Sequence, residues 1–205
     1  MTLCNGLLEQ LRLAREEETV ISGSFSGEAL HGGDLTKLDF RNVVLSGCHF
    51  TDCDFSQASF VDVRLEQCSF AGCRFFHTFW RRCALSCCKG DGANFCGSSL
   101  RETQILECAL RYANFSDGSW ERCTVRDSVL REAALSAIRL LRVAFSGTDL
   151  SGVDFFKTIL KGVDLSGCDI SGILVSENCA ELRGAAISAA QSIELARILG
   201  VRIVG

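Results

Sequence analysis

A large apolar residue returns at every fifth position from Phe25 to Val175, and Gly90 is the single exception. A helix returns a side chain to the same face about every 3.6 residues and a strand every second residue, so neither explains a period of five. If all these residues are to face one interior, the chain must turn once in each repeat. Such a strict short period is typical of a solenoid, in which every repeat packs on its neighbours.

The positions around each large residue follow a second pattern. Two residues before it the chain has a small residue, as at Cys68, Ala93 and Ala113, which predicts a second inward-facing position. Two residues after it glycine is frequent, which predicts a corner where the backbone needs conformational freedom. Aspartate often stands directly before it, as at Asp54 and Asp149, and we expect these carboxylates to bond to the backbone of the turn. The chain has no proline, as expected where each coil needs its backbone N–H groups.

This pattern resembles the pentapeptide-repeat family, whose motif is a small residue, Asp or Asn, Leu or Phe, and two polar residues. The matching segments are Ala93-Asn94-Phe95, Ala113-Asn114-Phe115, Val153-Asp154-Phe155 and Val163-Asp164-Leu165. The resemblance implies an all-β fold, a right-handed quadrilateral parallel β-helix with four pentapeptides in each coil. We therefore predict a β-helix over residues 21–180, with a short helix at each end of the chain.

The segment before the repeats, residues 1–20, is predicted to contain a capping helix over residues 5–18. Its apolar residues Leu7, Leu8, Leu11 and Ala14 recur at helical spacing, and most of the other positions are charged or polar. The end coil of a solenoid is open and must be covered, so a cap is the expected role. Binding of another protein through this helix is the alternative.

The repeat decays after Val175, and residues 181–205 are predicted to form a helix-strand module. Ser188 and Gln191 have the spacing of a capping box, which predicts the start of a helix. Gly200 stands where that helix would end, and residues 201–204 favour a strand.

The C-terminal segment resembles the Qnr quinolone-resistance proteins and their relatives. The shared pattern is Gln-x-x-x-Leu-x-x-x-Leu-Gly-apolar, here Gln191, Leu195, Leu199, Gly200 and Val201. In that group the terminal module joins two solenoids end to end, which implies a homodimer here. The predicted interface residues are Ile193, Leu195, Ala196, Ile198 and Leu199. The alternative is that the helix only plugs its own solenoid.

The 13 cysteines would indicate a disulfide framework in a small secreted chain, but most of them occupy the small inward position of the repeat. Cysteine packs as a small apolar residue, so we expect reduced thiols, with Cys48, Cys68, Cys88 and Cys108 stacked in one column. The N-terminus lacks the features of a signal peptide, and no apolar run is long enough to span a membrane. We therefore expect a cytoplasmic protein without membrane contact.

The sequence offers no convincing catalytic, cofactor or metal site. His77, Cys83, Cys87 and Cys88 are the one cluster of zinc-ligating residue types, but they lack Cys-x-x-Cys spacing and two of the thiols fall at inward positions. Neither a glycine-rich phosphate loop nor a Gly-x-Ser-x-Gly motif with triad partners stands out. We predict that the chain is not an enzyme and binds no cofactor or metal.

Aromatic and arginine side chains are typical of binding hot spots, and one part of the sequence brings several of them together. The residues that we predict to form a partner-binding surface are Arg74, Phe76, Phe79, Arg81 and Arg82. The basic excess there is too small for direct nucleic-acid binding. The alternative is an ordinary solvated face with salt bridges and isolated apolar residues.

The resemblance to the Qnr and MfpA group also implies a function. Those proteins protect DNA gyrase or topoisomerase IV from quinolones, as rod-shaped dimers that mimic duplex DNA. Mimicry requires an acidic surface, whereas this sequence has a net charge of −4 and no uninterrupted acidic column. Two hypotheses follow: a topoisomerase-binding DNA mimic related to quinolone resistance, and a protein-interaction scaffold with another partner.

Overall fold

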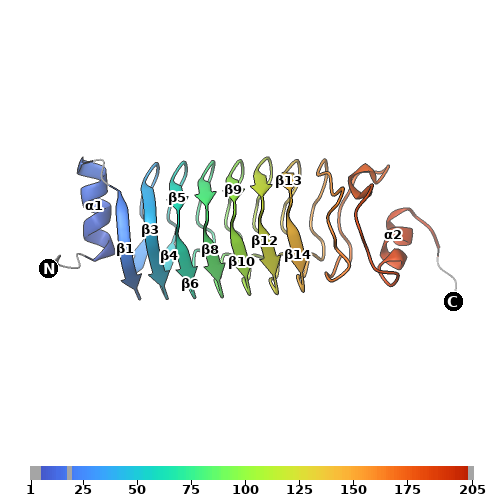
Figure 1. Cartoon of the computed structure of the whole chain (residues 1–205), viewed down its shortest axis with the longest axis horizontal. Helices are drawn as coiled ribbons and strands as arrows, with labels where there is room; N and C mark the ends of the chain where they lie inside the picture. Colours follow the sequence, from blue (N-terminus) through green and yellow to red (C-terminus); the bar gives the residue numbers. More distant parts are fainter. Residues whose placement is uncertain (1–5, 18–19, 203–205) are drawn as a thin grey trace.

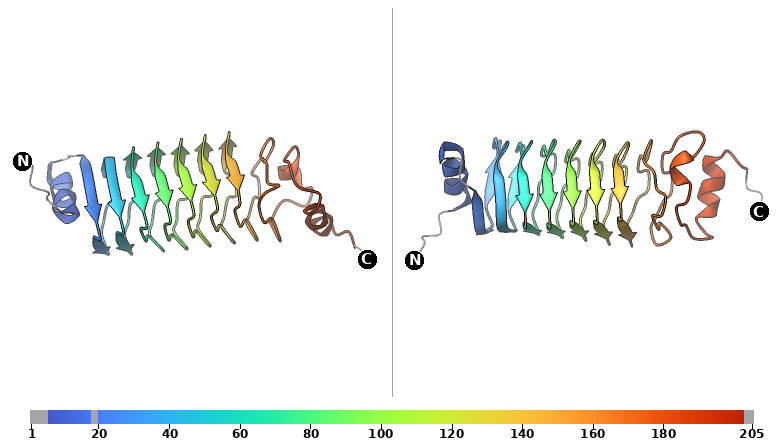
Figure 2. Two further views of the ribbon diagram at one scale, coloured as in Figure 1. Left: turned by 60° about the horizontal axis from the view of Figure 1, so that its bottom comes forward. Right: turned by 45° about the horizontal axis from the view of Figure 1, so that its top comes forward.

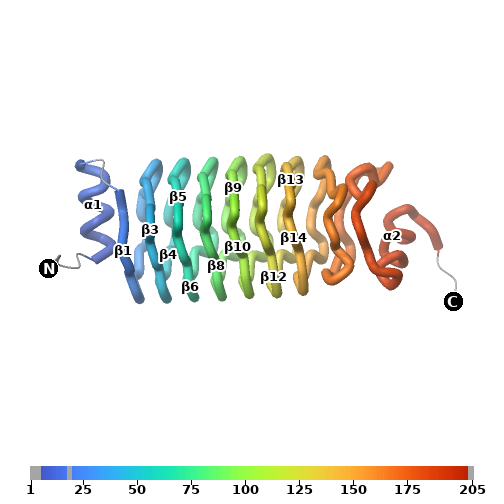
Figure 3. The backbone as a smooth tube through the Cα atoms, viewed as in Figure 1, coloured from blue at the N-terminus to red at the C-terminus, as the bar shows by residue number. Residues whose placement is uncertain are grey.

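Successive coils stack along one axis to give an elongated rod, with helix α1 at the N-terminal end and helix α2 at the C-terminal end (Figure 1). The structure, a computed structural model, describes residues 6–17 and 20–202. Strands of successive coils lie side by side in every view (Figure 2), and the backbone trace repeats nearly the same outline from coil to coil (Figure 3). The architecture is a parallel β-solenoid, which confirms the fold predicted from the five-residue period.

The regular elements are short and follow one another closely along the chain. They are α1 (Leu7–Glu17), β1 (Ile21–Ser26), β2 (Ala29–His31), β3 (Asp39–Ser46), β4 (His49–Thr51), β5 (Ser59–Val61), β6 (Arg64–Glu66), β7 (Phe79–Arg81), β8 (Ala84–Ser86), β9 (Ser99–Arg101), β10 (Gln104–Leu106), β11 (Ser119–Glu121), β12 (Thr124–Arg126), β13 (Arg139–Leu141), β14 (Ala144–Ser146), the 3-10 helix η1 (Ala180–Leu182) and α2 (Ser192–Ile198). Most strands have three residues, because one side of a coil holds only one repeat.

Neighbouring coils pair in parallel with a register of 20 residues. On one side of the rod Phe60 of β5 pairs with Trp80 of β7, and on the next side Leu65 of β6 pairs with Leu85 of β8. Strand β3 passes through the corner between these sides, so it pairs with both β5 and β6. The other two sides carry isolated parallel bridges, most of them in the same register, and one of these sides begins with the paired strands β2 and β4. Four sides in each coil give the predicted quadrilateral cross-section.

The large residue of each repeat fills the interior of the solenoid, as predicted. Phe55, Phe75, Phe95 and Phe115 form a stack in which successive ring centroids lie 4.7, 4.6 and 4.8 Å apart. All four rings are buried. Their spacing matches that of hydrogen-bonded strands, so each of these four coils adds one ring to the stack as it adds one strand to the ladder.

The position two residues after the large residue adopts a left-handed backbone conformation in most repeats, with Gly167 as an exception. Gly72 and Gly92 both have φ of 68°, which confirms the predicted corner. Residues other than glycine take the same conformation at equivalent positions, including Asp62 with φ of 56° and Arg82 with φ of 52°. Such a conformation is unfavourable for an L residue, and the packing and backbone bonds of the adjoining coils hold it in place.

Side chains directly before the large residue bond to the turn, as expected. Asp54 Oδ1 accepts the backbone N–H of Ser56 at 2.9 Å, and Asp149 Oδ1 accepts that of Ser151 at 3.0 Å. Asn94 replaces aspartate in another coil and makes the same bond. These side chains hold the corners of the coil.

Cysteines at the small inward position stack in a column, as predicted. Cys48, Cys68, Cys88 and Cys108 are buried, and none of the cysteines in the described part of the chain forms a disulfide. The thiol of Cys88 donates to a carbonyl oxygen of the preceding coil at 3.4 Å, and the other thiols of the column make similar bonds. Burial raises the pKa of the Cys83 thiol to about 11. Because they are buried and bonded to backbone carbonyl oxygens, the cysteines of the column act as packing groups.

Gly90, the exception in the repeat, makes room for Phe70 of the preceding coil. A Cβ atom on Gly90 would lie 2.2 Å from Cε2 of Phe70 and 2.8 Å from Cδ2 of Leu110. The buried Phe70 ring is edge-on to the Phe95 ring, with the centroids 6.2 Å apart. Phe70 thus occupies the volume that a large side chain at position 90 would fill, and the interior stays close-packed.

Helix α1 covers the first coil with three of its four predicted apolar residues. Leu7, Leu11 and Ala14 are buried, whereas Leu8 is 56 % exposed, contrary to the prediction. Leu8 follows Leu7 directly, so the helix turns it away from the face that meets the coil. Residues 5 and 18, the predicted limits of this helix, lie outside the described residues.

The last coil is longer than the others. Asp154 pairs with Leu174 in the 20-residue register, whereas Asp164 pairs with Ala186, two residues further along. The extra residues belong to a loop after Val175 that contains η1. The repeat therefore ends in the region where the sequence pattern decays.

The predicted Ser188–Gln191 pair forms both reciprocal bonds of a capping box, but it lies in the turn before helix α2, whose N-cap residue is Gln191 and not Ser188. Gln191 Oε1 accepts the backbone N–H of Ser188 at 2.7 Å, and Ser188 Oγ accepts the backbone N–H of Gln191 at 3.4 Å. The Gln191 side-chain amide also donates to the carbonyl oxygens of Leu165 and Cys168, both at 2.8 Å. One glutamine therefore starts the helix and fastens it to the solenoid.

Helix α2 ends at the predicted glycine. Gly200 has φ of 73°, and the backbone N–H of Val201 donates to the carbonyl oxygen of Ala196 at 2.8 Å. Because this bond holds the backbone of Val201 against the helix, residues 201–202 form no strand, contrary to the prediction. The remaining residues of the predicted strand, 203–204, lie outside the described residues.

Replacing Gly90 by alanine is expected to lower the free energy of unfolding by about 1–3 kcal/mol, because the new methyl group overpacks the interior against Phe70. Gly167→Ala is the matched control, since a Cβ atom at Gly167 meets nothing within 4 Å and its φ lies outside the left-handed region. Urea denaturation of both variants measures the difference. Equal stability of the two variants would contradict this account of Gly90.

Candidate interaction surface

The predicted partner surface is spread over two sides of the rod and two corners. Arg74 lies on one side, Phe79 and Arg81 lie on the next side in β7, and Phe76 occupies the corner between them. Arg82 occupies the following corner, with left-handed φ. Phe79 is 40 % exposed and Phe76 is partly buried. Phe76 and Phe79 therefore lie at and just after one corner of the coil. Arg74 precedes them along the coil, and Arg81 and Arg82 follow them.

Two of the three arginines in this surface are paired with carboxylates of the preceding coil. Arg74 Nε lies 3.1 Å from Asp54 Oδ2, and Arg82 bonds to both carboxylate oxygens of Asp62 at 2.7 and 2.6 Å. Arg81 makes no ion pair with the residues that the structure describes. The salt-bridged face weighed as the alternative thus accounts for part of the patch. The exposed remainder, Phe79 and Arg81, stays a prediction as a binding site.

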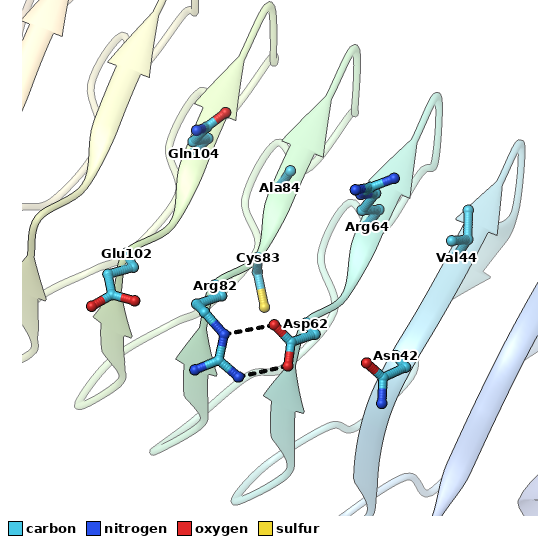
Figure 4. A pocket seen from close by; sticks show the side chains of 9 residues that line it. All are labelled: Asn42, Val44, Asp62, Arg64, Arg82, Cys83, Ala84, Glu102 and Gln104. Atoms are coloured by element: carbon cyan, nitrogen blue, oxygen red, sulfur yellow. Dashed lines mark hydrogen bonds and ion pairs between the residues drawn. The ribbon is translucent and has the colours of Figure 1, made fainter.

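Ion pairs between coils continue along the corner that carries Arg82. The equivalent residue is Asp62 in the preceding coil and Glu102 in the following coil. Glu102 pairs with Arg122 at 2.8 Å. Asp62, Arg82 and Glu102 border a groove of about 580 Å³ whose lining also includes Arg64 (Figure 4). The hydrogen bonds from Arg82 lower the pKa of Asp62. Positive and negative groups alternate here, so the groove has no dominant charge.

The arrangement of this groove offers no evident catalytic chemistry. Cys83 lines it, but the thiol is 3 % exposed and donates to two backbone carbonyl oxygens.

Residues 6–17 and 20–202 contain no group of three or more His, Cys, Asp or Glu side chains placed to hold a metal ion. No helix within those ranges is long and apolar enough to cross a membrane.

The predicted dimer interface divides into two groups. Ile198 packs against the solenoid core, so α2 closes the end of its own rod. Ile193 is 46 % exposed and Leu199 is 62 % exposed. Leu195 and Ala196 are partly buried. The helix therefore contacts its own solenoid through Ile198 and leaves Ile193 and Leu199 exposed.

Sequence reasoning missed a further groove, beside the long last coil. Phe156, Ile159 and Lys161 line it together with Arg183, from the far side of the loop. The interruption of the repeat after Val175 was the signal that could have located this groove, because an extra loop breaks the even surface of a solenoid.

Two profiles of pentapeptide repeats match the chain. The profile described as pentapeptide repeat region matches residues 58–135, and the profile described as pentapeptide repeats (8 copies) matches residues 29–60, 39–75 and 142–172. These segments together span more than half of the sequence and lie within the coils described above. The chain belongs to the pentapeptide-repeat family.

Solved structures of QnrB1 resemble this one. A trypsin-treated variant of QnrB1, a plasmid-mediated fluoroquinolone resistance protein, gives a TM-score of 0.55 and 23 % identity over 89 % of this chain and 90 % of that chain. Full-length QnrB1 gives a TM-score of 0.51 and 22 % identity over 87 % of this chain and 100 % of that chain. At these identities the similarity shows a shared fold. A search of curated proteins finds no match to the chain.

Replacing Arg82 by glutamine is expected to raise the pKa of Asp62 toward its ordinary value, because the hydrogen bonds that lower it are lost. The pair stabilises the folded protein at neutral pH, and this contribution is lost as the pH falls through the lowered pKa. Titration of the Asp62 carboxyl by NMR measures the change. Arg64→Gln is the control, since Arg64 lines the same groove and makes no described ion pair; an equal shift in both variants would contradict the assignment.

Proposed function

We propose that the chain is a non-enzymatic binding protein that presents the sides of a rod to a protein partner. One observation carries the proposal: most cysteines of the repeat are buried in the core, and aspartates such as Asp54 and Asp149 bond to the backbone of the corners. These groups have structural roles, so the remaining exposed side chains are the ones that can contact a partner. A scaffold of stacked coils positions such side chains at regular intervals.

The first candidate partner is a type II topoisomerase, either DNA gyrase or topoisomerase IV. This candidate is supported by the fold shared with QnrB1 over most of both chains and by the elongated shape of the rod. The action we propose is imitation of duplex DNA, in the manner of a quinolone-resistance protein. A cytoplasmic location belongs to the same proposal, because these enzymes act on bacterial chromosomes.

The second candidate is a scaffold for a different protein partner. It is favoured by the ion pairs between coils, because Asp62 and Glu102 are neutralised by Arg82 and Arg122 and so contribute little to an acidic, DNA-like surface. A scaffold of this kind would use local apolar and arginine contacts, such as those at Phe79 and Arg81.

A supercoiling assay distinguishes these candidates. The purified chain is titrated into DNA gyrase, and into topoisomerase IV in a matching decatenation assay, each with and without a quinolone. A type I topoisomerase is the control. The topoisomerase proposal predicts inhibition of gyrase or relief of quinolone inhibition that rises with the chain's concentration, and no effect on the type I enzyme. If gyrase and topoisomerase IV respond in neither assay, that proposal is wrong and the scaffold proposal stands.

We also propose that two rods pair through α2, because Ile193 and Leu199 remain exposed on its outer surface. Replacing Leu195 and Leu199 together by glutamate is expected to give a folded monomer, since an apolar interface does not tolerate unpaired charges. Sedimentation velocity measures the change in mass. Leu8→Glu is the control, because Leu8 is an exposed leucine at the opposite end of the rod. A double variant that stays dimeric would place the interface elsewhere.

A further inference from the structure

The long last coil creates an apolar groove near the C-terminal end of the rod. Its volume is about 530 Å³, and Phe156 and Ile159 form its apolar part. Phe156 is 44 % exposed and Ile159 is 70 % exposed. Large apolar side chains with this degree of exposure commonly mark a surface that binds another molecule when they cluster beside a groove. We call this feature, with Lys157, Lys161 and Arg183, the last-coil groove.

The wall of the last-coil groove is fixed by a buried carboxylate. Glu181 is 5 % exposed, and its Oε1 accepts the backbone N–H of Lys157 at 3.0 Å. Its Oε2 accepts the hydroxyl of Ser176 at 2.6 Å and the backbone N–H of Ser176 at 3.1 Å. Both oxygens are thus engaged within the fold, and the inserted loop is tied to the preceding coil. The groove is therefore a formed feature of the structure.

The exposed charges around the last-coil groove are positive. Lys157, Lys161 and Arg183 line it, are exposed, and form no ion pair with the residues that the structure describes. Glu181 is the only acidic residue in the described lining, and its carboxylate is buried. Glu177 lies in the same loop and is exposed, but it does not line the groove. Three unpaired cations in a chain with a net charge of −4 make this site electrostatically distinct.

We propose that the last-coil groove binds an acidic segment of a partner protein that inserts a large apolar side chain between Phe156 and Ile159. The partner's carboxylates pair with Lys157, Lys161 and Arg183, and its apolar side chain covers the exposed apolar surface. This combination supplies both the charge and the apolar area that the groove presents. The site is separate from the predicted patch at Phe79 and lies beyond the function proposed above.

The chemistry of the groove favours a peptide over a nucleic acid. The Lys157 ammonium lies 5.1 Å from the centroid of the Phe156 ring, so one face of that ring is already covered by a cation. Single-stranded nucleic acid requires open aromatic faces along a basic strip, and this site offers one ring and three cations. An apolar side chain can instead reach the exposed parts of Phe156 and Ile159.

The proposal is tested by selecting short random peptides on the full-length chain. The library is first depleted on a groove variant, Ile159→Ser with Lys161→Glu, and then selected on the unchanged protein. Enriched peptides are expected to be acidic and to contain a large apolar residue. The most enriched peptide is then labelled with a fluorophore and its Kd measured by fluorescence anisotropy. Groove-dependent enrichment of peptides without acidic residues, or no groove-dependent enrichment, overturns the proposal.

A matched control uses the same two slots in an earlier coil. Phe79 and Arg81 stand where Ile159 and Lys161 stand, so Phe79→Ser with Arg81→Glu makes an equivalent change outside the groove. The groove variant is expected to raise Kd about tenfold or more, and the control variant to leave it nearly unchanged. Circular dichroism establishes that both variants fold. Equal loss in both variants overturns the proposal, as does stronger groove-dependent binding of oligo-dT or of anionic lipid vesicles.

Discussion

The whole structure depends on backbone hydrogen bonds between one coil and the next. The backbone N–H of Phe95 donates to the carbonyl oxygen of Asn114 in the following coil at 2.6 Å. The backbone N–H of Asn94 donates to the carbonyl oxygen of Cys73 in the preceding coil at 3.0 Å. Each repeat is thus bonded in both directions along the rod. Proline would remove a donor from this network, and the sequence contains none. The bonds require one fixed coil length, and that length determines which side chains meet.

A fixed coil length means that side chains interact mainly along columns. Arg82 reaches Asp62 and Arg122 reaches Glu102 because each pair is separated by one coil. The same rule stacks the phenylalanine rings inside and the cysteine thiols beside them. Charges that look like an arginine-rich face in the sequence are therefore partly neutralised by carboxylates one coil away. The charge of each part of the surface therefore depends on residues 20 positions apart, and it can be judged from the sequence only when such residues are compared.

The sequence was sufficient to predict the repeating part of the fold. The large residues predicted the interior, as Phe55, Phe75, Phe95 and Phe115 illustrate, and the glycines predicted the corners. It was not sufficient to predict how Phe70 fills the volume beside Gly90, because that depends on the tilt of one ring. The last-coil groove was missed for a related reason: its lining comes from Phe156 and Arg183, which are brought together by a loop outside the repeat.

The ends of the rod are where this chain departs from its repeat. A coil in the middle has a partner on both sides, whereas the last coil must be covered by something that is not another coil. Here the covering residues include Gln191 and Ile198, and the extra loop is held by Glu181. A loop that breaks the register cannot reproduce the even pairing of the columns, so cations and apolar side chains beside it stay unpartnered. The end of the repeat is therefore where this solenoid gains a surface that its regular coils do not have.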